Sequence, residues 1–310
     1  MYNNMDMSDL IILAADEQWW WGQTVKEFTA HRLVLCAASP VFHQLFYPVE
    51  GGPDIPPCLS LSQNNSNNSN NSVKVEIEGI PPIAVEAMLE YCYKDRFEKS
   101  DYENGYSRNL LWRLWHAAKV FRIKHLVQLC SEVLESTLCD ETVFWDLNYS
   151  LVYADLGTDI MRKRVKGRIE KQGNSMFEHP NLVWLDTTAI REILSCRAMG
   201  SSEPGVVLNN TLRWSLYQLD RTLCEEEDGK KDAEIPLESR IRLIKQIKDG
   251  RIKEFTEEDV SKYLDRVLDL VPFSELSQKE FLLHVMDSGL LDQVGTTILA
   301  IFFLAFTYYI

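Results

Sequence analysis

The first signal in the chain is a set of short apolar and alternating stretches near its start. The apolar run at residues 10–13 predicts a strand over 9–14, and a hairpin would join it to a second strand at about 23–28. Residues 73–77 alternate between apolar and polar positions and predict a third strand. We therefore expect a small sheet whose strands are separated by other elements.

Apolar residues elsewhere in the first half recur with the period of amphipathic helices. Two short helices are predicted over 31–38 and 40–47, where Ser39 before Pro40 is typical of an N-cap followed by a first-turn proline. Longer helices follow the third strand. Strands and helices together predict one α+β unit that ends near residue 138.

The second half shows no convincing strand pattern. Helical periods cover 142–155, 158–171, 187–195, 205–221, 237–248, 257–270 and 277–291. We expect an all-helical region over residues 139–292.

Three segments stand outside these patterns. Residues 50–72 carry prolines and then repeated Asn-Asn-Ser, a low-complexity insert that predicts a mobile loop. Three adjacent tryptophans, at 19–21, indicate either a partner-binding patch or a hairpin that covers a neighbouring helix. The uncharged, apolar tail at 293–310 is compatible with a membrane anchor, a terminal helix on the bundle, or the end of a truncated chain.

Composition excludes several classes of function. The net charge is −14 at pH 7, and nucleic acids or anionic lipids would require a basic surface. The seven cysteines include no C-x-x-C pair, which favours a reducing, cytoplasmic location without disulfides or zinc. We recognise no signal peptide, no metal-binding or nucleotide-binding motif and no catalytic motif, so we expect no cofactor and no enzyme activity.

The run Phe28-Thr29-Ala30-His31-Arg32-Leu33-Val34-Leu35-Cys36-Ala37-Ala38-Ser39-Pro40-Val41-Phe42 resembles the opening of a BTB (POZ) domain. Residues 73–93 and 116–123 are similar to later parts of the same family pattern. The resemblance implies a BTB/POZ fold over 1–138, with short strands capped by helices, and a protein-interaction adaptor.

The second half resembles, more weakly, the helical BACK domain that follows many BTB domains. The similarity rests on residues 206–214 and on parts of 268–291. We recognise no kelch, MATH or β-sandwich module in the sequence.

The BTB resemblance implies homodimerisation through the first strand and first helices. A buried acid–base pair of the family falls on Asp9 and Arg32, although Arg32 could instead be simply exposed. The residues expected at the dimer interface are Asp9, Leu10, Ile12, Arg32 and Leu33.

Cullin-binding members of the family carry a hydrophobic-x-Glu motif after the second short helix. Here Glu50 fits, but Pro48 occupies the hydrophobic position. The residues expected to contact a cullin are Phe46, Tyr47, Val49, Glu50, Phe121, Lys124 and His125. For Phe46 and Phe121, ordinary core packing is the alternative.

Taken together, the resemblance implies a cytoplasmic, homodimeric adaptor that links an unidentified substrate protein to a cullin-RING ubiquitin ligase. The alternative is a BTB scaffold without a ligase role. A third interpretation adds tethering to a membrane through 293–310.

Overall fold

The computed structural model describes residues 8–16, 24–62, 73–97, 105–195, 203–219 and 237–248, together with Val267, Leu270, Val271 and Leu276. The tryptophan run, the Asn/Ser repeats, nearly all of the predicted helices at 257–291 and the tail at 293–310 lie outside the described residues. The chain divides into two compact units, 1–138 and 139–310. Each is described by itself.

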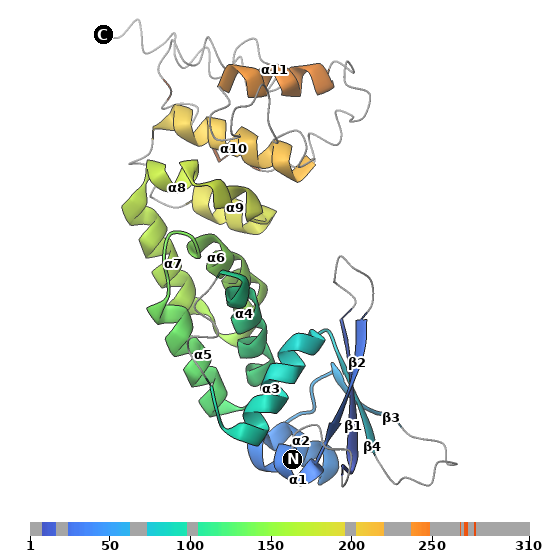
Figure 1. Cartoon of the computed structure of the whole chain (residues 1–310). Coiled ribbons are helices and arrows are strands. Elements are labelled where there is room, and N and C mark those ends of the chain that lie inside the picture. Colours follow the sequence, from blue (N-terminus) through green and yellow to red (C-terminus); the bar gives the residue numbers. More distant parts are fainter. Residues whose placement is uncertain are drawn as a thin grey trace, which may run out of the picture. The chain divides into compact units, whose positions relative to one another are not determined.

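The first unit contains a four-stranded sheet with the order β2-β1-β4-β3 (Figure 1). Its strands are β1 (Leu10–Asp16), β2 (Thr24–Ala30), β3 (Leu59–Ser62) and β4 (Val73–Glu78). β1 pairs with β2 antiparallel and with β4 parallel, and β3 pairs with β4 antiparallel. The parallel pair requires a long crossover, which the helices and β3 between β1 and β4 provide.

The prediction that residues 50–72 form a loop is wrong for β3. Leu59 is buried and lies opposite Ile77 of β4, so this short segment completes the sheet. Its Leu-Ser-Leu-Ser sequence alternates as a strand should. It escaped notice because it is only four residues long and lies between prolines and the Asn/Ser repeats.

Among its described residues, the first unit also has the helices α1 (Arg32–Ala38), α2 (Pro40–Phe46), α3 (Pro82–Lys94), α4 (Gly105–Val120) and α5 (Lys124–Ser136). In Figure 1, α1, α2 and α3 lie along one face of the sheet. β1 turns Leu10, Ile12 and Ala14 to its buried face, where none is exposed, because alternate residues of a strand point the same way. The unit therefore has one core between the sheet and its helices.

Ser39 joins α1 to α2 and is completely buried. Its hydroxyl accepts a hydrogen bond from the N–H of Phe42 at 3.3 Å, which confirms the predicted N-cap. The same hydroxyl donates to the carbonyl oxygen of Phe121 at 2.6 Å. One side chain thus begins α2 and ties it to the turn between α4 and α5.

The second unit is helical in all its described elements: α6 (Val143–Val152), η2 (Ala154–Leu156), α7 (Asp159–Gln172), α8 (Asn174–Glu178), η3 (Pro180–Trp184), α9 (Thr187–Leu194), α10 (Pro204–Leu219) and α11 (Leu237–Lys248). Its core includes Phe144, Phe177 and Trp214, all buried. The predicted fold class, a small α+β unit followed by a helical region, is confirmed. Across the described part of the chain, we find no helix long and apolar enough to cross a membrane.

We expect Ser39→Ala to lower the free energy of unfolding by about 1–3 kcal/mol, because the change removes a helix cap and leaves a buried carbonyl without its donor. Urea unfolding checks this. Ser136→Ala is the control: Ser136 is exposed and bonds only within its own helix, to the carbonyl oxygen of Val133, so we expect a change within about 0.5 kcal/mol. Equal losses in the two variants would contradict the assignment.

Candidate functional site

An ion pair links the residue before β1 to the first residue of α1. One carboxylate oxygen of Asp9 accepts the backbone N–H of Arg32 at 2.9 Å, and the other accepts Nε of the guanidinium at 2.9 Å. The Arg32 and Asp9 side chains are 33% and 42% exposed in the single chain. The pair therefore forms as expected, but it is partly exposed rather than buried.

This pair also caps a helix. His31, at the N-cap position of α1, makes no side-chain capping bond, and Asp9 supplies the missing acceptor from outside the helix. Burial by itself would raise the pKa of Asp9. The hydrogen bonds from the backbone and side chain of Arg32, with its positive charge, outweigh burial and hold the pKa of Asp9 below its usual value.

The other residues expected at a dimer interface divide into two kinds. Leu33 on α1 is 81% exposed, which is unusual for a large apolar side chain. Leu10 and Ile12 are fully buried inside their own chain, so their expected place at an interface is wrong for the side chains. They belong to the face of β1 that the helices cover.

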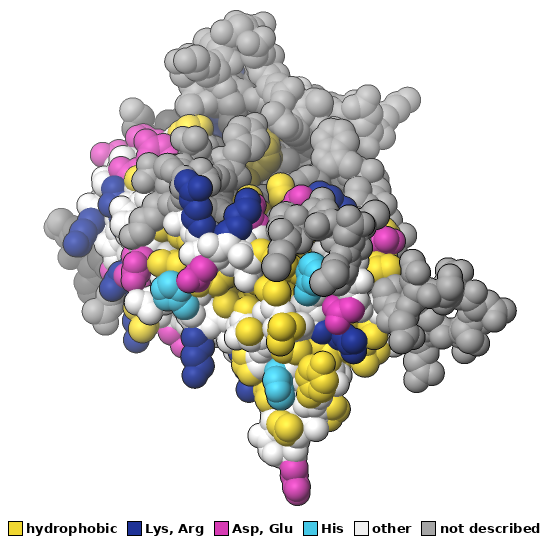
Figure 2. All heavy atoms as spheres, turned by 60° about the horizontal axis from the view of Figure 1, so that its bottom comes forward, with side chains coloured by type: hydrophobic (Ala, Val, Ile, Leu, Met, Phe, Trp, Pro, Cys, Tyr) yellow, Lys and Arg dark blue, Asp and Glu magenta, His cyan; other side chains and the backbone are white. Residues whose placement is uncertain are grey.

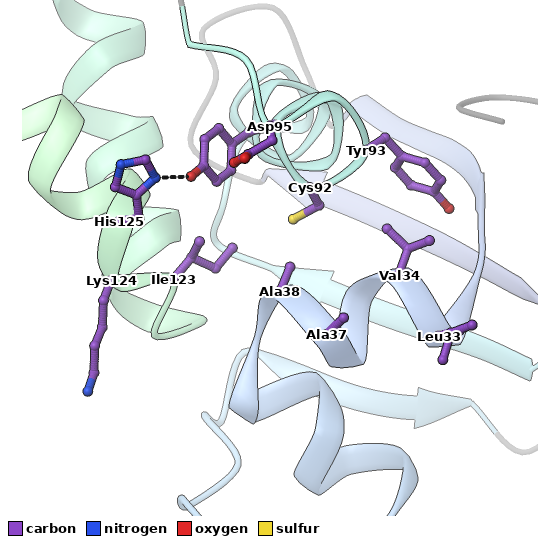
Figure 3. A pocket seen from close by; sticks show the side chains of 11 residues that line it. Leu33, Val34, Ala37, Ala38, Cys92, Tyr93, Asp95, Ile123, Lys124 and His125 are labelled. Carbon is purple, nitrogen blue, oxygen red and sulfur yellow. Dashed lines mark hydrogen bonds between the residues drawn. The ribbon is translucent and has the colours of Figure 1, made fainter.

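A groove of about 610 Å³ lies beside this exposed face of α1. Figure 3 shows its walls: one face of α1, the last turn of α3 and the turn between α4 and α5. The lining residues are Leu33, Val34, Ala37, Ala38, Tyr91, Cys92, Tyr93, Asp95, Ile123, Lys124 and His125. Three segments distant in the sequence therefore share one largely apolar surface.

Two tyrosines from the last turn of α3 fix the walls of the groove. The hydroxyl of Tyr91 lies 2.6 Å from Nδ1 of His125 (Figure 3). The backbone N–H of His31 donates to the hydroxyl of Tyr93 at 2.7 Å, and its Nδ1 lies 2.8 Å from the same oxygen. The end of α3 is thereby joined both to the start of α1 and to the start of α5.

Burial keeps two titratable groups of the groove, Tyr91 and Cys92, in their neutral forms at neutral pH. Burial raises the pKa of Tyr91 to about 12, helped by the nearby charge of Asp95. Burial also raises the pKa of the Cys92 thiol to about 12. At neutral pH Cys92 is therefore a thiol and not a nucleophilic thiolate. The groove offers apolar contact and hydrogen bonds.

The backbone of the segment after α2 is fixed by the side chain of Gln44. The amide of Gln44 accepts the backbone N–H of Val49 at 3.0 Å and donates to the Val49 carbonyl oxygen at 3.1 Å. A Cβ at Gly52 would lie 2.0 Å from Oε1 of Gln44, so glycine leaves room for this clamp. Gly51, at φ 75°, turns the chain between Val49 and Gly52.

The clamp leaves apolar residues in solvent. Tyr47 and Val49 are 53% and 52% exposed, and Glu50 is also exposed. Figure 2, which brings the α1–α2 end of the molecule forward, shows hydrophobic side chains gathered there with histidines among them. Such a surface is typical of an interaction site.

A row of phenylalanines connects this segment to the α4–α5 turn. The ring of Phe42 stacks on that of Phe121, with centroids 4.7 Å apart, and on that of Phe46 at 6.3 Å. Phe121 is completely buried, so for its side chain the alternative of core packing is right and the expected cullin contact is wrong. Lys124 and His125, just after it, are exposed.

The structure thus brings both expected cullin-binding segments to the two ends of one short helix. Sequence reasoning missed the residues that do this, namely Ser39 as a tie, Phe42, Gln44 and Gly52. Ser39 and Phe42 both contact Phe121, which is distant in the sequence, whereas Gln44 contacts nearby Val49 and Gly52 only because of how the loop after α2 folds. Within the described residues, no group of three or more His, Cys, Asp or Glu side chains could hold a metal ion.

Residues 1–138 match the BTB/POZ domain family along their whole length. This part of the chain is a BTB/POZ domain. Human Kelch-like protein 6 is 20% identical over 200 residues, which cover 64% of this chain and 28% of the relative. Human BTB/POZ domain-containing protein 3 is 22% identical over 221 residues, 71% of this chain and 36% of the relative, and the mouse protein is equally similar.

The alignment with these relatives extends beyond the BTB/POZ domain, but it covers only about a third of their length. The chain therefore contains a BTB/POZ domain, and domains of this family are typically protein-interaction modules. The BACK assignment of the helical unit stays a prediction.

We expect Asp9→Asn to lower the free energy of unfolding at neutral pH by at most about 1 kcal/mol, because both partners are partly exposed. The pKa of Asp9 is lowered in the folded state, so its stabilisation is present above the unfolded pKa and is lost as the pH falls through the folded one. Urea unfolding, measured from neutral pH to about pH 3, should show that the difference in unfolding free energy between the wild type and Asp9→Asn shrinks.

Asp9→Ala provides the comparison for this experiment. Alanine also removes the acceptor for the Arg32 N–H. In the wild type at low pH, the protonated Asp9 carboxyl still has an oxygen that accepts this bond. The additional loss of stability in Asp9→Ala, relative to Asp9→Asn, should therefore persist at low pH. A gap between wild type and Asp9→Asn that is unchanged at low pH would contradict the role of the charge.

Proposed function

We propose that this protein is a homodimeric BTB adaptor that links a substrate protein to a cullin-RING ubiquitin ligase. The main support is one arrangement: α2 carries the exposed Tyr47–Glu50 segment at one end, and at the other it is tied through Ser39 to the turn before α5, whose first residues, Lys124 and His125, are exposed. A partner that spans α2 could contact both. The likeness to Kelch-like protein 6 supports the same adaptor class.

Homodimerisation is supported by the face of α1. Leu33 is exposed, and the α1 wall of the groove that it borders consists of small and apolar side chains, so a second copy of the helix would bury apolar area, worth about 25 cal/mol per Å². BTB domains generally dimerise. The partly exposed pair of Asp9 and Arg32 lies at the start of the same helix and would lose solvent in such an interface.

Cullin binding is supported by how Glu50 is presented. The Gln44 clamp holds the backbone at Val49, so Glu50 leaves a fixed point rather than a free loop. A residue held in place before binding loses less conformational entropy on association. Pro48, at the family's hydrophobic position, is the observation that favours the alternative, a scaffold without a ligase role.

An adaptor of this kind performs no chemistry of its own. It holds the substrate near the ligase, and dimerisation raises the effective concentration of each bound partner.

For the dimer, we expect Leu33→Glu to convert the protein to a monomer, because it places a charge in an apolar interface. Sedimentation velocity on the full chain measures the mass. Ile83→Glu is the matched control: Ile83 is also exposed, at 51%, but lies in the first turn of α3, at the end away from the groove, and should stay dimeric. A dimeric Leu33→Glu variant, or a monomeric wild type, would refute this interface.

For the cullin, we expect the full chain to bind the N-terminal domain of the BTB-specific cullin, and Glu50→Ala to weaken binding about tenfold. Gly52→Ala should weaken it similarly, because its methyl group displaces Gln44 from Val49. Isothermal titration calorimetry measures the affinity. Asp54→Ala removes a nearby exposed carboxylate and should change little.

Dimeric wild-type protein that does not bind the cullin would refute the ligase role and favour the scaffold. Equal effects of Glu50→Ala and Asp54→Ala would show that general charge, and not the proposed contact, governs binding.

A further inference from the structure

The central strand β1 is apolar on both of its faces, whereas its neighbour β4 is apolar on one. The alternate residues of β1 that point towards the helices are fully buried. The residues between them point to the opposite side of the sheet and are partly exposed: Ile11, Leu13 and Ala15. In β4 the residues on that same side are all charged: Lys74, Glu76 and Glu78.

This difference between the two strands indicates that the outward side of β1 is built to be covered. A strand whose second face meets water usually alternates between apolar and polar residues, as β4 does. An apolar run on both faces is typical of a strand that is covered on both sides. Figure 1 shows α1, α2 and α3 along the other face of the sheet, and the outward residues of β1 remain partly exposed.

Carboxylates border this apolar row on both sides. The register places Leu13 between Glu27 of β2 and Glu76 of β4, and Glu78 lies beside Ala15. Glu27 and Glu78 are exposed, and Glu76 is partly exposed. The acidic sheet face is our name for six residues: Ile11, Leu13, Ala15, Glu27, Glu76 and Glu78.

Two lysines belong to the same strands, and neither is paired with these carboxylates. Lys26 of β2 points to the helix side of the sheet, where its Nζ pairs with Glu86 of α3 at 2.7 Å. Lys74 does lie on the outward side, but beside Ile11, in a row of the sheet without a carboxylate. Within the described residues, no ion pair joins any of the three glutamates of the acidic sheet face to a cation. Three carboxylates thus stand against one ammonium group on this side.

The spacing of the carboxylates fits a helix that lies along β1. Glu27 and Glu76 flank β1 and are two strand spacings, about 10 Å, apart. A helix with its side chains is about 10–12 Å across. Helices pack on sheets through an apolar stripe. When that stripe meets Ile11 and Leu13, cationic residues at its two edges lie over the two carboxylates.

The charge of the acidic sheet face decides against other occupants. A nucleic acid or an anionic membrane would be repelled by the carboxylates. A second copy of the same face would bring three more carboxylates and only one more ammonium group. A neutral apolar segment would take solvent from the carboxylates without offering them a partner. A basic amphipathic helix satisfies both the apolar row and its acidic borders.

We propose that the acidic sheet face is a docking site for an amphipathic helix of a partner protein, in which lysine or arginine residues flank an apolar stripe. The stripe covers Ile11 and Leu13, and the cations pair with Glu27 and Glu76. The proposal does not depend on the ligase role or on the α1 dimer, because none of its residues belongs to α1, α2 or the segment after α2.

The test uses the full chain labelled with ¹³C at its isoleucine and leucine methyl groups. The probe is the peptide acetyl-Leu-Lys-Lys-Leu-Leu-Lys-Lys-Leu-Leu-Lys-Lys-Leu amide, whose leucines share one helix face. We expect the peptide, at low-millimolar concentration, to shift the methyl signals of Ile11 and Leu13, which the Ile11→Val and Leu13→Met variants assign. Leu13→Thr should weaken binding about five- to thirtyfold, because threonine keeps the preference for a strand but loses apolar contact. Glu76→Gln should weaken it about two- to fivefold, through one exposed ion pair.

Matched controls make the outcome decisive. The same peptide with glutamate in place of lysine keeps the apolar stripe and should cause no shift. Val152→Thr and Asp155→Asn make the corresponding changes at exposed positions of the helical unit and should bind the lysine peptide like the wild type.

Absent shifts, equal shifts with the glutamate peptide, or unchanged binding by a folded Leu13→Thr variant would overturn the proposal. So would a Leu13→Thr chain of lower mass than the wild type in sedimentation, which would identify a second copy as the occupant.

Discussion

The hydroxyl of Ser39 is the contact on which the BTB/POZ domain's surface depends. It caps α2 and, through the Phe121 carbonyl, joins that helix to a turn 82 residues later in the chain. Since the site is fully buried, each of these bonds replaces one that water could no longer supply. The phenylalanine row built on Phe42 then extends the connection along the helix. These contacts fix the positions of the exposed residues at both ends of α2.

The exposed surfaces of the two units share a construction. In the BTB/POZ domain, Gln44 fixes the backbone that presents Tyr47 and Val49, and in the helical unit Asn148 and Gln218 fix the backbone that presents Trp184. Side-chain amides suit this task because each can donate and accept at once. The backbone beneath these exposed apolar side chains is already fixed before a partner binds, which lowers the entropic cost of binding.

The long described helices were predictable to within a few residues because their period is set by neighbours three and four positions apart, whereas the short α8 and η3 were not predicted. The order of α1 and α2 and the N-cap at Ser39 followed from the local run around Pro40 in the same way. β3 was missed, since a four-residue strand acquires its structure from the β4 edge and not from its own sequence. Leu10 and Ile12 were assigned to the correct strand but to the wrong environment. A period of two says that alternate residues share a face, and it does not say what covers that face.

The sequence by itself determined the type of each long element, the BTB resemblance and the acidic net charge, because these depend on local order and on composition. The tertiary structure alone decided which side chains remain in solvent. Phe121 and Leu33 both occur in family-like segments, yet one is buried against Phe42 and the other is exposed on α1. The pairing of Asp9 with Arg32 and the Gln44 clamp were settled in the same way. Each is a contact between residues that only the folded chain brings together, and its energy depends on the solvent that folding excludes.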